Sequence, residues 1–301
     1  MRLAITGGTG FVGSHLLDAA LAAGHRIVAL TRRGQPERDG VDWVMGDLGT
    51  REALEQLVDG ADAIIHVAGT ISAANAAGFE KGNVAGTLAM LAAATAGGVR
   101  RFVHVSSLAA REPKLSLYGG SKAKAEELVH SSGLDWAIVR PPAVYGPGDK
   151  ETLELFRMAK LGLMLMPPKG RVSVIHADDL ARLLLALAAP DVASNILIEA
   201  DDGKPGGWSH REFARALAAA VGTRPAIVSS PGMLLRLAAR VDQLWRGEKA
   251  KLTADRAAYF SHRNWVVEPK RACPPQLWQP RIETLQGLAD TAAWYREQGW
   301  L

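Results

Sequence analysis

The chain has 301 residues, of which 48% are hydrophobic and 22% charged, a balance typical of a globular protein with one large domain or two interlocked ones. The net charge of +4 is dispersed, without a basic stripe interleaved with aromatic residues, which argues against a nucleic-acid partner. The single cysteine, Cys273, excludes a disulfide within the chain and fits a reducing compartment.

The first 140 residues alternate short β-rich runs with helix-like segments. Such alternation predicts a parallel sheet wrapped by helices on both faces. The nearly continuous apolar runs suit strands that are buried on both sides. Strands are expected at 2–6, 25–30, 63–69, 101–107 and 136–142, and helices at 11–23, 50–58, 82–96 and 119–131.

After residue 140 the pattern loosens, because prolines interrupt it repeatedly up to residue 168. Alanine- and leucine-rich stretches predict helices at 178–189 and 209–221, and a last helix is expected near 281–297. The segment 231–247 has apolar residues at helical spacing, which favours a packed amphipathic helix over a membrane anchor. We therefore expect a smaller mixed lobe in this half of the chain.

No segment is expected to span a membrane. The best candidate, residues 161–168, is about half as long as the roughly 18 apolar residues that a crossing requires. The sequence leaves a peripheral membrane contact there open. The first ten residues lack the cationic start, long apolar middle and cleavage site of a secretory signal, so we expect a cytoplasmic protein.

A glycine-rich stretch, TGGTGFVG at residues 6–13, follows the first expected strand and opens the first expected helix. Glycines in this context allow a tight turn and a close backbone approach to a pyrophosphate, and the helix N-terminus offers unpaired N–H groups. The stretch therefore predicts a dinucleotide site. The alternative is a purely structural loop.

The end of the second strand carries no acid to bind the ribose hydroxyls, and Thr31, Arg32 and Arg33 stand there instead. Arginines at this position can bind a phosphate on the ribose 2′ oxygen, which favours NADP over NAD. The alternative is a pair of solvated arginines on a loop. Asp47, in GDL after the third strand, is a candidate acceptor for the adenine amino group or, alternatively, a turn or helix N-cap residue.

The stretch YGGSK places Tyr118 four residues before Lys122, a pair that arises often by chance. Together with TGGTGFVG, GDL, HVAG, VSS and RPPAVYGPGD, in order over residues 6–149, and with HADDLA at 176–181, it resembles the extended short-chain dehydrogenase/reductase family. The resemblance is to its NAD(P)-dependent epimerase/dehydratase and 3β-hydroxysteroid dehydrogenase or dihydroflavonol reductase-like branch. It implies a Rossmann-type, doubly wound parallel sheet in residues 1–140 that binds the dinucleotide. Residues 141–301 would form a smaller mixed α/β lobe that mainly binds substrate, with some segments returning to the sheet.

The resemblance also implies catalytic roles. Tyr118 would exchange a proton with the substrate oxygen, and Ser107, rather than Ser106, would hydrogen-bond that oxygen. Lys122 would bind the nicotinamide ribose and, with the oxidised nicotinamide, lower the phenol pKa from its ordinary value of about 10. Asn83 would support the site, through a water relay to the lysine, or would simply cap the helix that starts there.

The cofactor is expected along the carboxyl ends of the strands. The residues that the motifs place there are Thr6, Gly7, Gly10, Phe11, Val12, Gly13, Thr31, Arg32, Arg33, Asp47, Leu48, Val67, Ala68, Gly69, Tyr118, Lys122, Pro141 and Val144. His66 would lie along the cofactor or be a buried, satisfied strand histidine. The histidines show no metal-ligand spacing, so no metal site is expected.

Two departures from the family pattern bear on the substrate. Ser107 and Tyr118 are only 11 positions apart, and Ala143 replaces an asparagine that is common in the sugar-nucleotide enzymes. The short spacing implies a truncated covering loop and substrate entry from a more open side, and Ala143 favours an apolar alcohol or ketone. We predict an NAD(P)-dependent oxidoreductase that transfers a hydride between NADP(H) and a hydroxyl or ketone of a fairly apolar small molecule. The alternatives are a nucleotide-sugar epimerase or dehydratase and a non-catalytic dinucleotide-binding, redox-sensing module. Relatives often form homodimers through the helices at 82–96 and 119–131.

Overall fold

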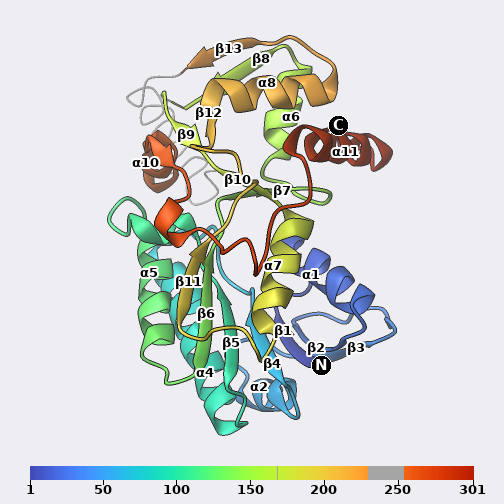
Figure 1. Cartoon of the computed structure of the whole chain (residues 1–301), viewed down its shortest axis with the longest axis vertical. Helices are drawn as coiled ribbons and strands as arrows, with labels where there is room; N and C mark the ends of the chain where they lie inside the picture. The colour runs from blue at the N-terminus through green and yellow to red at the C-terminus, as the bar shows by residue number, and fades with distance from the viewer. Residues whose placement is uncertain (168, 230–253) are drawn as a thin grey trace. The chain divides into compact units, whose positions relative to one another are not determined.

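A computed structural model describes residues 1–167, 169–229 and 254–301 (Figure 1). The chain divides into two compact units. The first contains Met1–Pro141, Leu180–Glu199 and Cys273–Trp278, and the second contains Pro142–Asp179, Ala200–Ala272 and Gln279–Leu301. The amphipathic helix expected at 231–247 lies outside the described residues. The assignment of cofactor binding to 1–140 and of substrate binding mainly to 141–301 stays a prediction.

The first unit is built on a seven-stranded sheet in the order β11-β6-β5-β4-β1-β2-β3. All neighbouring strands are parallel. The order reverses at β1, and in such sheets dinucleotides bind at the carboxyl ends of the strands beside the reversal. The prediction of a Rossmann-type, doubly wound sheet is therefore confirmed. Its strands are β1 (Arg2–Thr6), β2 (Arg26–Thr31), β3 (Val41–Met45), β4 (Ala63–His66), β5 (Arg101–Val105), β6 (Asp135–Arg140) and β11 (Ile196–Glu199).

Helices flank this sheet (Figure 1). They are α1 (Phe11–Ala22), α2 (Arg51–Val58), α3 (Ala76–Phe79), α4 (Gly86–Ala96), α5 (Leu117–His130) and α7 (Ala177–Ala188), with a π-helical turn η1 (Glu80–Ala85) and a 3-10 turn η2 (Leu108–Arg111). Ala4 and Phe102 belong to one buried hydrophobic cluster with Leu57 of α2 and Met90 of α4. Ile5 points to the opposite face, because side chains alternate along a strand, and it is also fully buried. The sheet is thus covered on both faces.

The second unit is a smaller mixed α/β body, as predicted. Its helices are α6 (Leu153–Lys160), α8 (His210–Val221), α10 (Ala254–Ser261) and α11 (Thr284–Glu297). Its short strands form the sheets β10-β7, β12-β9-β14 and β13-β8, from β7 (Ala143–Tyr145), β8 (Leu163–Met166), β9 (Arg171–Val172), β10 (Val174–His176), β12 (Trp208–Ser209), β13 (Ala226–Ser229) and β14 (Asn264–Trp265). Phe156, Leu217, Leu288 and Tyr295 belong to one core that joins α6, α8 and α11.

Two further features of the described ranges bear on function. None of the helices there combines the length and the apolar character that a bilayer crossing requires. Those ranges also hold no grouping of His, Cys, Asp or Glu suited to a metal ion.

Candidate active site

The loop between β1 and α1 forms a tight turn in which Gly10 N donates to Gly7 O at 3.0 Å. Gly7 has a φ of +75°, and a Cβ on it would lie 2.7 Å from Ala68 N. A Cβ on Gly13 would lie 1.9 Å from Gly7 O. Gly10 is the N-cap of α1 and forms no side-chain cap bond, and the first turn of the helix holds no acid. The unpaired N–H groups of this turn therefore form a positive helix N-terminus that no side chain neutralises. This cradle fits a pyrophosphate.

Thr6 ties the end of β1 to the segment that follows β4. Its Oγ1 accepts from Ala68 N at 3.2 Å and lies 2.7 Å from Nδ1 of His66. The other ring nitrogen of His66 lies 3.2 Å from Thr87 Oγ1, and burial lowers the pKa of His66 to about 3. His66 is therefore a neutral, hydrogen-bonded histidine inside the unit, which favours the structural alternative for it.

The end of β2 presents two exposed cations. Arg32 and Arg33 are exposed, and neither guanidinium forms an ion pair within the described part of the chain. The Thr31 hydroxyl donates to the Arg33 carbonyl at 2.7 Å and so fixes the turn. Asp47 Oδ1 accepts from Gly49 N at 2.8 Å and from the Thr50 hydroxyl at 3.2 Å. Asp47 therefore has a turn role, and its contact with adenine stays a prediction.

The two glycines of YGGSK allow helix α5 to begin close to another backbone segment. Ser116 caps the helix by accepting from Gly119 N at 2.9 Å. A Cβ on Gly119 would lie 2.6 Å from Ala109 O, and one on Gly120 would lie 3.0 Å from Pro113 O. Larger residues would push the first turn of α5 away from η2. The glycines thus set the position of Tyr118, which is on that turn.

Ser107 lies near enough to Tyr118 for its side chain to lower the pKa of the phenol, and its Oγ accepts from Ala109 N at 3.2 Å. The ammonium of Lys122, one turn further along α5, is buried and donates to Val105 O at 2.9 Å. Ser106 lies at the same strand end, but its hydroxyl donates to Glu126 at 2.5 Å. The geometry thus separates the two serines, with Ser107 beside the phenol and Ser106 bound elsewhere.

Burial sets the protonation of the two titratable groups. It raises the pKa of Tyr118 above its ordinary value, and the Ser107 side chain opposes this shift. Burial also lowers the pKa of Lys122 to about 8, against the opposing effect of Glu126. With the pKa of Tyr118 raised and that of Lys122 at about 8, both groups are protonated at neutral pH. The pKa of Tyr118 is thus raised rather than lowered as expected, because desolvation of the phenolate is its largest cause.

Asn83 lies in the π-helical turn η1 and is buried. Its amide donates to Thr70 O at 2.9 Å and to the Ser121 hydroxyl at 2.8 Å, and its Oδ1 accepts from Thr70 N at 2.7 Å. It therefore joins the segment after β4 to α5, and the alternative of a helix cap is wrong. Single π turns occur frequently at functional sites. A Cβ on Gly69 would lie 3.0 Å from both Asn83 Oδ1 and Lys122 Nζ, so the asparagine and the lysine face the same point.

The remaining predicted residues fall in both units. The Pro141 carbonyl accepts from Leu108 N at 3.0 Å, which holds the start of η2 to the end of β6. Val144 belongs to the second unit, where it pairs with Ile175 between β7 and β10. The cofactor roles of these two residues stay predictions.

A buried ion network behind the serines was not predicted from the sequence. Glu126 accepts from Arg140 at 2.6 and 2.8 Å. Arg140 also lies 3.6 Å from Glu199, which pairs with Arg111 at 3.2 Å. Glu126 follows Lys122 by one helical turn, as Lys122 follows Tyr118. The spacing of four residues from Lys122 could have indicated from the sequence that Glu126 lies on the same helix face. Its partner Arg140 and the more distant Arg111 come from other segments, which the sequence pattern does not reveal.

We expect Glu126→Gln to lower the pKa of Lys122 below about 8, because the substitution removes the carboxylate that favours the ammonium. The alkaline limb of the pH profile of kcat/KM should move to lower pH. The variant should also unfold at lower denaturant concentration, since Arg140 loses its buried partner. Glu127→Gln, on the exposed side of the same turn, is the matched control. An unchanged pH profile would contradict the link between Glu126 and Lys122.

Comparison of the sequence with known proteins identifies relatives over nearly the whole chain. The model of the NAD dependent epimerase/dehydratase family matches residues 3–197. The chain is 38% identical to the ceramide reductase of Caulobacter vibrioides, covering 99% of this chain and 96% of that protein. It is 30% identical to the 4-hydroxy-2-methyl-3-oxo-4-farnesyl-3,4-dihydroquinoline-1-oxide ketoreductase of Stigmatella aurantiaca, covering 96% and 95%. It is 29% identical to the 2-alkyl-3-oxoalkanoate reductase of Stenotrophomonas maltophilia, covering 90% and 93%.

Solved structures share the fold. WbmG of Bordetella bronchiseptica, in complex with NAD, matches with a TM-score of 0.77 at 20% identity, covering 100% of this chain and 95% of that one. The dTDP-glucose 4,6-dehydratase DesIV of Streptomyces venezuelae, with NAD and DAU bound, matches with a TM-score of 0.72 at 23% identity, covering 100% and 98%. At these identities the likeness concerns the fold alone.

Proposed function

This chain belongs to the NAD-dependent epimerase/dehydratase family and is an NAD(P)-dependent oxidoreductase, and we propose that it uses NADPH to reduce a ketone on a long-chain, apolar substrate. The observation that carries the proposal is the placement of Ser107 beside the Tyr118 phenol, whose pKa it lowers, one helical turn from the buried ammonium of Lys122. Three relatives named as reductases support the direction of the reaction. Their names describe a ceramide, a farnesyl-bearing quinoline oxide and an alkyl oxoalkanoate, which supports an apolar substrate.

The roles of the residues follow from their protonation states. The bound nicotinamide would supply the hydride that reaches the carbonyl carbon. Ser107 would donate a hydrogen bond to the carbonyl oxygen, and Tyr118 would give that oxygen its phenolic proton. The raised pKa of Tyr118 keeps this proton in place until the oxygen gains negative charge. The Lys122 ammonium would then stabilise the phenolate and hold the cofactor ribose.

The preference for NADPH rests on Arg32 and Arg33. We expect the double substitution Arg32→Ala with Arg33→Ala to raise the Kd for NADPH about 10- to 100-fold, the value of one or two charge-assisted hydrogen bonds. The Kd for NADH should change little, because NADH lacks the 2′-phosphate. Fluorescence titration of both cofactors measures this. Arg51→Ala, which removes an exposed arginine from α2, is the control. Equal weakening for the two cofactors would refute the 2′-phosphate role.

The proposed reaction is tested by following the consumption of NADPH through its absorbance. The substrates to compare are an N-acylated long-chain amino alcohol that carries a ketone, a 2-alkyl-3-oxoalkanoate, and UDP-glucose. We expect one NADPH consumed per ketone reduced and no reaction with UDP-glucose. Conversion of UDP-glucose without net loss of NADPH would instead support the epimerase alternative.

A further inference from the structure

The two-stranded sheet β8-β13 in the second unit has an apolar face that is exposed. Leu163 and Leu165 of β8 are 46% and 54% exposed, while Met164 and Met166, which alternate with them, are buried. Val228 of β13 is 47% exposed and pairs with Leu165. Leu161, at the turn before β8, is 83% exposed. Four of the 11 large hydrophobic side chains exposed in the described ranges therefore lie on or beside one small sheet.

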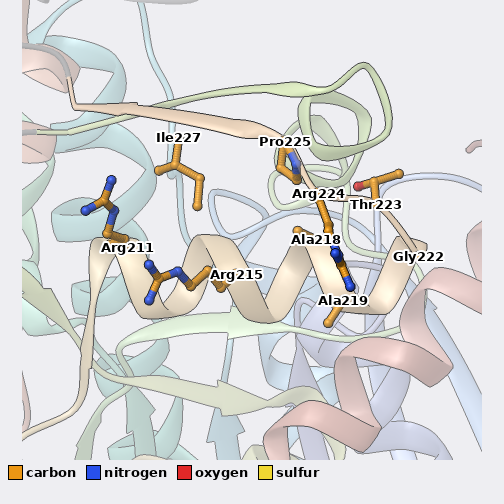
Figure 2. Close-up of a pocket in the computed structure, with 9 residues that line it drawn as sticks. All are labelled: Arg211, Arg215, Ala218, Ala219, Gly222, Thr223, Arg224, Pro225 and Ile227. Carbon is orange, nitrogen blue, oxygen red and sulfur yellow. The ribbon is translucent and has the colours of Figure 1, made fainter.

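Arginines gather on the α8 side of this sheet (Figure 2). A hollow of about 590 Å³ between α8 and β13 is lined by Arg211, Arg215 and Arg224, together with Ile227 (Figure 2). The three arginines are exposed, and none of them forms an ion pair with any residue that the structure describes. The nearest acid in sequence, Glu212, is engaged at its own helix start, where it accepts from Ser209 N at 2.7 Å.

The elements around the sheet contain more basic than acidic residues. Residues 153–169 and 208–229, which include α6, β8, α8 and β13, hold six arginines and lysines and two glutamates. Their net charge of +4 equals the net charge of the whole chain. The elements around the apolar sheet therefore carry an excess of positive charge.

We propose that the β8-β13 face docks on an anionic lipid bilayer. Leu161, Leu163, Leu165 and Val228 would enter the boundary between headgroups and acyl chains, and the arginines of the hollow would bind lipid phosphates. Affinity for such a surface increases with the apolar area buried and with the number of cations near anionic lipid. A second copy of the chain fits this face less well, because a symmetric contact would place the same cations opposite one another. Binding to the bilayer does not depend on the proposed reaction. It would, however, bring the candidate active site close to ketones that are dissolved in the lipid.

Flotation of the full chain with vesicles tests the proposal. We expect binding to phosphatidylcholine vesicles that contain phosphatidylglycerol, and at least about tenfold weaker binding without it. Binding should weaken as salt rises from about 0.1 M to about 1 M, where the screening length falls to about 3 Å. The double variant Leu163→Ser with Leu165→Ser, and the triple variant Arg211→Gln, Arg215→Gln and Arg224→Gln, should each lose at least about tenfold in partitioning.

The control replaces two leucines that are equally exposed elsewhere, Leu88→Ser with Leu285→Ser, at 54% and 50% exposure. Thermal melts and NADPH titration confirm that each variant is folded. Equal partitioning of all variants would overturn the proposal. Ultracentrifugation gives a second contrary outcome, namely a wild-type dimer that the Leu163 and Leu165 substitutions dissociate, since this would assign the face to a second copy. Flotation requires no turnover, so a failure of the proposed reaction leaves this test intact.

Discussion

Tyr118→Phe is expected to reduce kcat for ketone reduction by about 10²- to 10⁴-fold, the usual contribution of a positioned proton donor. Phenylalanine keeps the ring, which packs against Phe79 at 6.2 Å between centroids, but removes the proton that the substrate oxygen must receive. The Kd for NADPH should stay within about twofold, because the loss falls on the transition state and not on cofactor binding. Steady-state kinetics and fluorescence titration measure the two quantities.

Tyr259→Phe is the matched control for this variant. Tyr259 stacks on Trp265 in the second unit, an interaction that phenylalanine preserves, so turnover should stay near the wild-type value. If Tyr118→Phe also turned over at the wild-type rate, Tyr118 would have no part in proton transfer.

The second large effect is expected at the glycine loop, where Gly13→Ala should abolish measurable binding of NADPH and NADH. A Cβ at residue 13 would lie 1.9 Å from Gly7 O, far inside van der Waals contact. The turn must therefore open, and the N–H groups at the start of α1 lose their alignment toward the pyrophosphate. Isothermal titration with both cofactors and a thermal melt, which separates loss of the site from loss of the fold, measure the effect.

Gly8→Ala tests the same loop without the clash. A Cβ there would meet Leu17 at 3.4 Å, an ordinary contact, so cofactor affinity should stay close to that of the wild type. Comparable binding by the Gly8 and Gly13 variants would show that the loop does not hold the cofactor in the way that its geometry indicates.

Local patterns were sufficient to predict most of the first unit. The strand expected at 2–6 is β1 (Arg2–Thr6), and the helix expected at 11–23 is α1 (Phe11–Ala22). Both predictions depend on a hydrophobic run and on the glycines next to it, and these signals are contained within a few residues of the sequence. The helix expected at 119–131 begins earlier, at Leu117, because Ser116 supplies the cap.

Features that depend on distant partners were missed. β11 is a four-residue strand that is fixed only by pairing with β6, from Ile196 with Ala137 to Glu199 with Arg140. That pairing also brings Glu199 to the ion network, which no local pattern reveals. The π turn at Asn83 depends on the Thr70 backbone and on Ser121, contacts that the expected helix at 82–96 does not contain.

Within the candidate site, the sequence predicted which residue types gather but not their electrostatics. Ser107, Tyr118 and Lys122 were predicted from motif order, and the structure brings them to one strand end and one helix face. The direction of the Tyr118 pKa shift depends on burial, which a motif does not encode. A phenol whose pKa is raised keeps its proton at neutral pH, which suits a reductase, because the reaction begins with the acid in place.

The most direct test of the central claim uses NADPH that carries deuterium at the transferable C4 position, together with a long-chain ketone and the wild-type chain. The account predicts an alcohol with one deuterium on the carbinol carbon for each NADPH oxidised, measured by mass spectrometry. A ketone that remains unreduced while the chain binds NADPH, or an alcohol whose carbinol hydrogen does not come from the cofactor, would contradict it.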